Sequence, residues 1–445
     1  MSISVAETNR LHTKYPEVFR QNVFKRWGLP LGLGAAVLYL IFCWFFFNVG
    51  PAIQNGKWDR ASIYLQDWFS WRATPRLRFG EDGSITPQWS SRGQYPKNAT
   101  IDWLTPNADG SVTVTFSGDD RLDITTTGVN AIVDGQTYPI AITKGAALAP
   151  ATVPSAIVQD RQKVLVDFGF SGQAEIRDNQ VYVQRRFLGW ANFLYDPTSP
   201  LWGHDLFGTI GLVFSGDRVN PAMSNAQFVL NQWLNNQAWQ HGDILTKLLQ
   251  TLVMAFVGTL FATLLAFPLA FIAARNITAN RPANWAMKRF FDFIRSVDML
   301  IWALFFTRGF GPGPIPGIAA IFFTDTGALG KVYAEALENV DDKQREGMQS
   351  VGASPMAINR FGVVPQVLPV FISQSLYFWE SNTRSATVIG AVGAGGIGLK
   401  LLEAMGTNSD WDKVAYMVLL ILGVVFLFDN MSNAIRSRLI GPASH

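Results

Sequence analysis

Hydrophobic residues are distributed very unevenly along the chain. Residues 27–56 and 248–274 contain no Asp, Glu, Lys or Arg, and each stretch is long enough to cross about 30 Å of hydrocarbon as a helix. Other apolar runs predict four further spans: one over 290–307, one that ends near Gly330, one that begins at Phe361 and one over 414–429. The pattern therefore predicts an α-helical polytopic membrane protein with six transmembrane helices.

Residues 57–240 have the pattern of a soluble domain instead. Short runs of alternating apolar and polar residues predict β-strands at 111–116, 121–126, 131–133, 163–168 and 180–187. Asp134-Gly135 suits a tight hairpin turn. Four tryptophans then predict a segment that lies along the membrane surface, Trp190, Trp202, Trp233 and Trp239. The sequence thus predicts an inserted β-rich extracytoplasmic domain that leads into an interfacial segment.

These patterns divide the chain into four parts. They are a cytoplasmic N-terminus at 1–26, a first transmembrane anchor at 27–56, the β-rich domain with its interfacial segment at 57–240, and a five-helix core at 241–440. The core includes a cytoplasmic loop at 331–365.

Basic residues indicate on which side of the membrane each loop lies. They precede the first span, follow the second and close the chain: Arg10, Lys14, Arg20, Lys25 and Arg26, then Arg281, Lys288 and Arg289, then Arg436 and Arg438. By the positive-inside rule all three groups are cytoplasmic. We expect a multi-pass protein of the bacterial inner membrane with both termini in the cytoplasm. A net charge of only +3, spread over these groups, argues against nucleic-acid binding.

The third predicted span carries charges near its cytoplasmic end. Asp292, Arg295 and Asp298 recur every three residues, so we expect them to lie near one stripe of a helix and to pair along it. Side chains this close to a helix end can reach water. A structural ion pair is therefore favoured over a substrate contact.

The stretch from Glu346 to Pro365 is polar and rich in turn residues, although hydrophobic segments surround it. Gly352 is the residue type that best adopts the left-handed backbone that ends a helix. Ser354 suits an N-cap, and Pro355 suits the first helical position because its missing N–H is not needed there. The stretch predicts a helix, a tight corner and a second, short helix.

The spacing of Glu346, Gly352 and Pro365 resembles the EAA loop of ABC-importer permeases, which docks into the ATPase. The family pattern has alanines where this chain has Gly347 and Met348. It has Ile and Leu where this chain has two other residues, Gly362 and Val364.

Three further stretches resemble the phosphonate-importer permeases in particular. They lie at 239–249, 329–341 and 383–398, and the whole resemblance covers about residues 190–440. It implies the core of a type I importer permease. The positions that it assigns to ATPase coupling are Glu346, Gly347, Gly352, Ala353, Ser354, Pro355 and Pro365.

The resemblance also implies partners and a substrate class. Such a permease forms a homodimer with a second copy of itself, docks ATP-binding cassette subunits, and receives a small anionic phosphonate from an extracytoplasmic binding protein. A permease for phosphite, phosphate esters or another small anion is the alternative within the class. A membrane-anchored sensor or assembly scaffold is the alternative of another class, and whether a P-loop ATPase co-purifies separates the two.

Two groups of residues are candidates for the translocation pathway. Glu380 and Arg384 lie four residues apart inside the fifth predicted span, where an unpaired charge costs several kcal/mol. Arg384 could meet the anionic substrate, or the pair could be a bridge between helices. The glycines that follow let the backbone bend and approach its neighbours closely, Gly393, Gly395, Gly396 and Gly398.

Several activities find no support in the sequence. The chain has no G-x-x-x-x-G-K-[ST] motif, so ATP hydrolysis is expected in a separate subunit. Gly393 to Gly398 satisfy G-x-G-x-x-G but follow an apolar helix instead of a strand, which argues against a dinucleotide site. His204 and His241 lack the ligand cluster that a metal site needs. We therefore expect no enzyme activity, no cofactor and no metal.

Overall fold

The computed structural model describes residues 14, 23–56, 58–89, 95–96, 101–407 and 410–440. The basic residues Arg10 and Arg20 of the predicted cytoplasmic N-terminus lie outside this description. The chain divides into two compact units, Met1–Leu65 and Gln66–His445.

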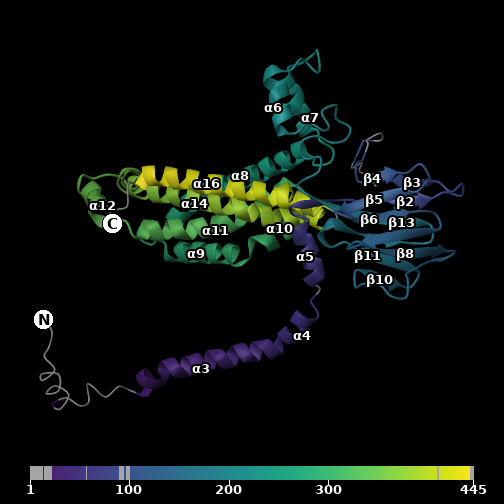
Figure 1. Cartoon of the computed structure of the whole chain (residues 1–445). Coiled ribbons are helices and arrows are strands. Elements are labelled where there is room, and N and C mark those ends of the chain that lie inside the picture. The colour runs from purple at the N-terminus through teal and green to yellow at the C-terminus, as the bar shows by residue number, and fades with distance from the viewer. Residues whose placement is uncertain are drawn as a thin grey trace. The chain divides into compact units, whose positions relative to one another are not determined.

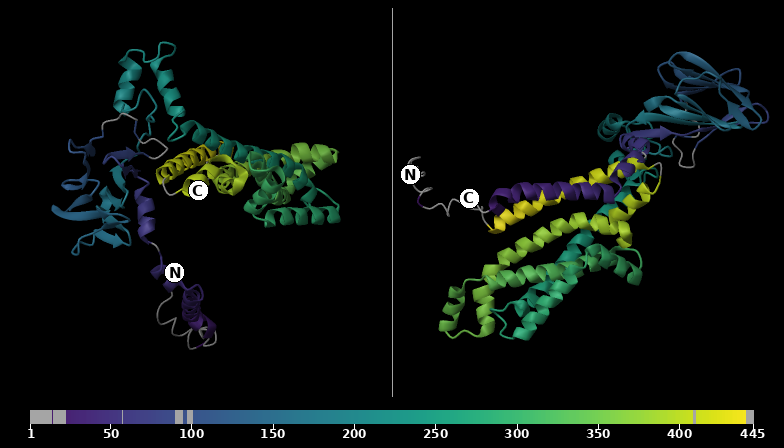
Figure 2. Two further views of the ribbon diagram at one scale, coloured as in Figure 1. Left: turned by 90° about the vertical axis from the view of Figure 1, so that its right-hand side faces the viewer. Right: turned by 90° about the horizontal axis from the view of Figure 1, so that it is seen from below.

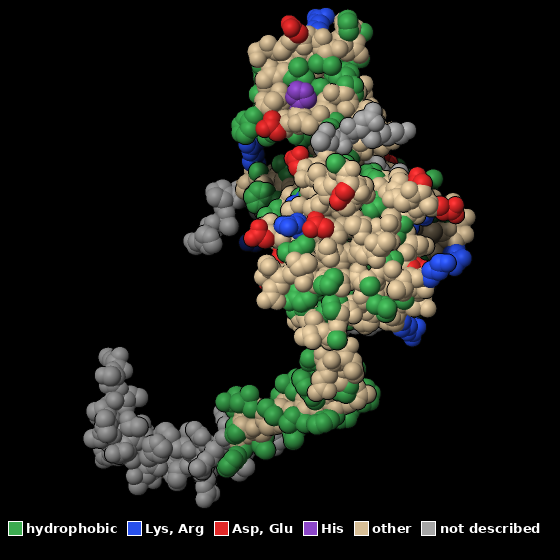
Figure 3. Space-filling model, turned by 45° about the vertical axis from the view of Figure 1, so that its right-hand side comes forward, with side chains coloured by type: hydrophobic (Ala, Val, Ile, Leu, Met, Phe, Trp, Pro, Cys, Tyr) green, Lys and Arg blue, Asp and Glu red, His purple; other side chains and the backbone are tan. Residues whose placement is uncertain are grey.

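The N-terminal unit is helical. Helix α3 (Val23–Phe46) is followed by α4 (Val49–Gln54) and α5 (Trp58–Gln66), with Asn48 in the left-handed conformation between α3 and α4. Large apolar side chains are exposed along α3 (Figure 3). Because α3 is long and apolar enough to cross a membrane, the predicted anchor is present, although this helix ends at Phe46 and not at Gly56.

Two antiparallel β-sheets form a sandwich in the second unit (Figure 1). One sheet has the order β10-β11-β12-β13-β2-β3, with β1 also paired to β13, and the other runs from β4 to β9 in sequence order. The strands are β1 Ser70–Ala73, β2 Arg76–Phe79, β3 Ile85–Gln88, β4 Leu104–Pro106, β5 Val112–Ser117, β6 Asp120–Ile124, β7 Gly128–Val133, β8 Gln136–Thr143, β9 Ala146–Leu148, β10 Ile157–Asp160, β11 Lys163–Asp167, β12 Gly172–Ile176 and β13 Gln180–Leu188.

The alternating sequence pattern explains the sandwich. In β5, Val112, Val114 and Phe116 are buried and alternate with more exposed threonines, as expected for a strand with one face in the core. Phe116 stacks on Phe168, which directly follows β11 of the other sheet, with ring centroids 4.0 Å apart. Each predicted run contains a strand, and the hairpin turn predicted between β7 and β8 is confirmed.

A helical hairpin and a run of turns connect the sandwich to the membrane bundle. The hairpin consists of α6 (Leu206–Ser215) and α7 (Asn225–Leu234). Asp205 caps α6, and Ser224 caps α7 in a full capping box with Gln227. Both helices therefore have well-defined starts although neither is long.

Helix α8 (His241–Ala273) packs along α11 (Pro314–Glu338), α14 (Val364–Ile389) and α15 (Gly396–Met405). Alanines on α8 are fully buried at intervals of one or two turns, Ala255, Ala262, Ala266 and Ala270, and such small residues let membrane helices approach closely. The last helix, α16 (Trp411–Ile440), packs on α14. The short α12 (Asp342–Ser350) and the sandwich lie at opposite ends of this bundle (Figures 1 and 2).

The predicted third span is not one helix. The structure has α9 (Arg281–Ser296) and α10 (Met299–Phe310), with extended residues Val297 and Asp298 between them. Asp298 accepts a hydrogen bond from the N–H of Leu300 and caps α10. The predicted stripe is therefore wrong for Asp298, whereas Asp292 does pair with Arg295 at 3.4 Å, and also with Lys331 of α11 at 3.0 Å.

Four helices of the described chain are long and apolar enough to span a membrane. They begin at Trp27, His241, Pro355 and Trp411. The predicted fourth span corresponds to α11, which runs on to Glu338 and not only to Gly330, and which carries Asp325 in its middle. The fold is a helical membrane protein with a β-rich domain.

Candidate functional site

Residues 342–363, within the loop predicted at 331–365, form a helical corner, which we call the coupling segment. Helix α12 ends at Ser350, and Gly352 then takes a φ of 76°. Ser354 accepts a hydrogen bond on its side chain from the N–H of Ala357, with Pro355 in the first turn of α13 (Pro355–Ala357). The predicted helix, corner at Gly352 and second helix start are confirmed.

Two details of the coupling segment differ from the expectation. A turn at 339–341 separates α12 from α11, and Asp341 caps α12. The second helix does not stop before Pro365, because a π-type turn, η2 (Ile358–Val363), leads directly into α14. The coupling segment is therefore continuous with α14 and joined to α11 by a three-residue turn.

The coupling segment is fixed to the bundle by a polar contact that sequence reasoning missed. Arg345 donates from Nη2 to the carbonyl oxygen of Asn276 at 2.6 Å, and Asn276 donates from its side chain to the carbonyl oxygen of Leu337 at 2.8 Å. Nearby, Lys288 of α9 pairs with Glu338 of α11 at 2.7 Å. These contacts hold α12 against the ends of three helices.

The free surface of the coupling segment combines an acidic residue with apolar ones. Glu346 and Gly347 are exposed. Val351 is 78% exposed, Met356 81% and Phe361 62%. Large apolar side chains this exposed at the end of a chain's helical bundle are typical of a protein-docking surface.

Glu380 and Arg384 belong to a larger charged network between α14 and α16. Arg384 lies 3.4 Å from Glu380 and 2.9 Å from Asp429, and Arg436 lies 3.0 Å from Glu380. Two basic and two acidic groups balance, so the network carries no excess charge. This geometry favours the bridge between helices that the sequence left open.

The glycine-rich stretch forms a bend between α14 and α15. Gly393, Gly395 and Gly396 all have positive φ values. At Gly398 a Cβ would lie 1.9 Å from the carbonyl oxygen of Thr387, so no larger residue fits. The expected bend and close backbone approach are therefore present. The glycine-rich stretch lies between two helices and does not follow a strand, as a dinucleotide-binding motif would.

An aromatic cluster joins the segment that follows the sandwich to the first and the last helix of the core, α8 and α16. His241 is fully buried; its Nε2 donates to the carbonyl oxygen of Phe193 at 2.7 Å, and its Nδ1 accepts from the hydroxyl of Tyr416 at 3.1 Å. Trp239 and Trp233 pack on the same imidazole. His241 therefore has a structural role, with both ring nitrogens engaged.

Asp196 stabilises the same segment between the sandwich and α8. Its carboxylate accepts from the Thr198 hydroxyl at 2.5 Å and from the N–H of Gln237 at 2.9 Å. Burial opposes ionisation of this group, but the hydrogen bonds outweigh burial and lower the pKa of Asp196.

A cavity of about 790 Å³ opens beside Asp196 and Trp239. Two lysines line it, but each is paired: Lys400 with Asp243 at 2.7 Å and Lys413 with Asp410 at 3.1 Å. Since neither lysine offers a free positive charge, the cavity is not a preformed site for an anion.

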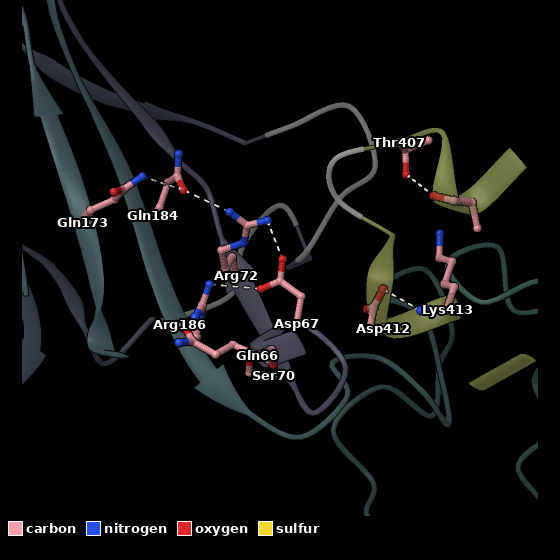
Figure 4. Close-up of polar contacts among 11 residues, drawn as sticks. Gln66, Asp67, Ser70, Arg72, Gln173, Gln184, Arg186, Thr407, Asp412 and Lys413 are labelled. Carbon is pink, nitrogen blue, oxygen red and sulfur yellow. Dashed lines mark hydrogen bonds and ion pairs between the residues drawn. The ribbon is translucent and has the colours of Figure 1, made fainter. Parts of the chain in front are cut away.

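A buried carboxylate also fixes the entry of the chain into the sandwich. Arg72 lies 2.7 Å from Asp67 and Arg186 lies 3.1 Å from it, and Figure 4 shows both guanidinium groups directed at that carboxylate. Gln184 accepts from Arg72 in the same group. These contacts tie β1 and β13 to the residue that precedes the sandwich.

Comparison with known proteins agrees with this geometry. Residues 266–441 match the family described as binding-protein-dependent transport system inner membrane component. The chain is 39% identical over 286 residues to the phosphite transport system permease protein PtxC of Stutzerimonas stutzeri, covering 63% of this chain and 95% of that protein. It is 45% identical over 121 residues to a cryptic phosphonate transport system permease protein, PhnE2 of Escherichia coli, covering 27% and 98%.

A third relative is matched over a smaller part of its length. The phosphate-import permease protein PhnE of Mycolicibacterium smegmatis is 33% identical over 198 residues, which is 44% of this chain and 37% of that protein.

The fold, the coupling segment and these matches define a membrane permease of an ABC importer. Within that class, the chain belongs to the phosphonate-type importer permeases.

Proposed function

We propose that the chain forms the translocation pathway of an ATP-driven importer for phosphonates, as one of two identical subunits. The observation that carries this proposal is the coupling segment, a rigid helical corner with exposed Glu346, Val351 and Met356 at the bundle end opposite the sandwich. Such a surface suits a P-loop ATPase, which the chain itself does not contain. A separate extracytoplasmic protein would deliver the substrate at the other end.

Purification with the ATPase subunit tests the coupling surface. We expect the ATPase to co-purify with the wild-type chain and to be lost when Glu346 is changed to Arg, because the reversal places a positive charge in the docking surface. An Asp217→Arg variant, which makes the same charge reversal at an exposed residue between α6 and α7, is the matched control. If no ATPase binds the wild-type chain, the sensor or scaffold alternative is favoured.

Phosphite is a second candidate substrate. It is favoured by the similarity to PtxC, which extends over 95% of that protein. Phosphonate and phosphite are both small anions with phosphorus–oxygen groups, and nothing in the cavity beside Asp196 separates them. Uptake by vesicles that contain the complete importer distinguishes the two substrates. Labelled methylphosphonate, phosphite and phosphate compete for uptake in this experiment.

A further inference from the structure

A buried polar cluster ties three membrane helices together. Asn382 of α14 donates from Nδ2 to Oδ2 of Asp325 in α11 at 2.5 Å, and to Oγ1 of Thr259 in α8 at 2.7 Å. The Thr259 hydroxyl lies 3.4 Å from the same Asp325 oxygen. Asp325 is only 2% exposed, and the other two residues are 3% exposed.

Asp325 has hydrogen-bonding partners but no cation. Within the described part of the chain, no lysine, arginine or histidine lies within ion-pair distance of its carboxyl group. A polar group inside a membrane bundle needs an internal partner, since lipid offers none. Thr259 and Asn382 supply that partner, so Asp325 is satisfied only while α8, α11 and α14 keep their present arrangement.

A second polar layer links the same three helices. The hydroxyl groups of Tyr333 in α11 and Ser375 in α14 are 2.5 Å apart, and Thr263 of α8 donates to Ser375 at 3.1 Å. Thr263 follows Thr259 by one turn of α8. Two layers of contacts oppose both sliding and rotation of the helices, which a single layer would not.

The clamped helices are also those that flank the coupling segment. Helix α11 leads into it and α14 leaves it, while Arg345 attaches it to the end of α8. We propose that Asp325 is a positioning residue that locks α8, α11 and α14 into one rigid body, so that a displacement of the coupling segment reaches the far end of the bundle. It acts through hydrogen bonds, without touching the substrate. The inference rests on the proposed function of the coupling segment.

Three variants separate hydrogen bonding from charge and from packing. Asp325→Asn keeps an acceptor oxygen but cannot be charged, and Asp325→Leu removes the hydrogen bonds while it keeps the number and branching of the side-chain heavy atoms. The double variant Asp325→Leu with Asn382→Leu also removes the amide that the single change leaves unsatisfied. Glu335→Leu makes the same kind of change at an exposed position of α11 and is the matched control.

The first measurement uses the permease without its ATPase. Spin labels at exposed Leu260 of α8 and Tyr377 of α14, in a Cys43→Ala background, report the distance between the two helices in lipid nanodiscs. One narrow distance is expected for the wild type, Asp325→Asn and Glu335→Leu, and a broadened distribution for Asp325→Leu. A narrow distribution in Asp325→Leu would show that Asp325 does not lock these helices together, and this result does not depend on ATPase binding.

The second measurement uses the complete importer in vesicles and records substrate transported per ATP hydrolysed. Asp325→Asn should stay within about twofold of wild type, whereas Asp325→Leu should fall by about tenfold with the ATPase still bound, the size of a typical coupling effect. The double variant should recover folded protein but not coupling. Equal loss in Asp325→Asn and Asp325→Leu, or recovered coupling in the double variant, overturns the proposal. Failure of the wild type to bind ATPase instead refutes the proposed function.

Discussion

Arg345 lies at hydrogen-bond distance from the backbone of Asn276, although the two residues are far apart in the sequence. The Nη2 to carbonyl distance is 2.6 Å, and Arg345 also lies 3.1 Å from Asp342 within α12. The contact joins the coupling segment to the connection between α8 and α9. A movement of α12 would therefore act on the α8–α9 connection as well as on α11 and α14.

Replacement of Arg345 by Ala should weaken coupling without preventing membrane insertion. Loss of a hydrogen bond from a charged group costs about 1.5 to 3 kcal/mol, so we expect transport per ATP to fall by at least about tenfold. Arg345→Lys should retain part of the activity, because an ammonium group can still reach one acceptor. Transport equal to wild type in Arg345→Ala would show that the contact is dispensable.

Gly352→Val should disrupt coupling to the ATPase while the protein remains inserted. The φ of 76° at this corner is unfavourable for a β-branched residue, with a cost of about 1 to 2 kcal/mol for the left-handed conformation. ATP hydrolysis stimulated by substrate is the measurement. Gly309→Val makes the same change at a helical position of α10 with open space around its Cβ, outside the coupling segment, and is the control that should behave as wild type.

Variants of the charged network around Arg384 distinguish a bridge between helices from a contact with the substrate. If it is a bridge, Arg384→Gln or Asp429→Asn alone should lower phosphonate uptake, because each removes the ion pair between α14 and α16 and leaves the network with an excess charge. The double variant removes both members of that pair and should recover most of the uptake at equal protein level. No recovery in the double variant, together with loss in Arg384→Lys, would instead indicate that the guanidinium group meets the substrate.

Asp196 should make stability depend on pH in the acidic range. Its pKa in the folded protein is below the ordinary 3.8, so its carboxylate stabilises the fold above that value, and the stabilisation is lost as pH falls through the lower, folded-state pKa. Asp196→Asn should destabilise the protein by about 1 to 3 kcal/mol near neutral pH. The unfolding temperature of the Asp196→Asn variant should therefore fall less than that of the wild type as the pH is lowered. The same acid dependence in wild type and variant would exclude Asp196 as the cause.

The α6–α7 hairpin should lie on the lipid surface, as the interfacial segment of the sequence predicts. Phe207 and Phe214 of α6 are 80% and 85% exposed, and apolar side chains on a short helix next to a membrane span favour the interface. A spin label at Phe214, in the Cys43→Ala background, should be more accessible to oxygen than to a water-soluble nickel complex. A label at exposed Asn231 of α7 should show the reverse. Equal accessibility to the nickel complex at both sites would place the hairpin in water.

Local patterns predicted the fold well wherever one face of an element meets the core. The alternation at Val112, Val114 and Phe116 was enough to place β5, and Gly352 with Ser354 was enough to place the corner of the coupling segment. In both cases the information lies within a few neighbouring residues.

Long-range contacts could not be predicted in the same way. The break before α10 depends on Asp298 capping a new helix, where the spacing of charged residues had suggested an unbroken one. Asp325 lies in α11 without a charged neighbour at helical spacing, and its partners come from α8 and α14. Only the packing of these helices shows that the three side chains meet.

The bonds of His241 to Phe193 and Tyr416 restrict how the pathway can open. They fasten the start of α8 to the start of α16 within a single subunit, with an aromatic layer packed around them. Separating these helix ends would expose a buried imidazole and several indole rings together, so this part of each subunit moves as a block. In the proposed dimer, such a block would leave the seam between the two copies, and not the middle of either one, as the route for a substrate that arrives from outside.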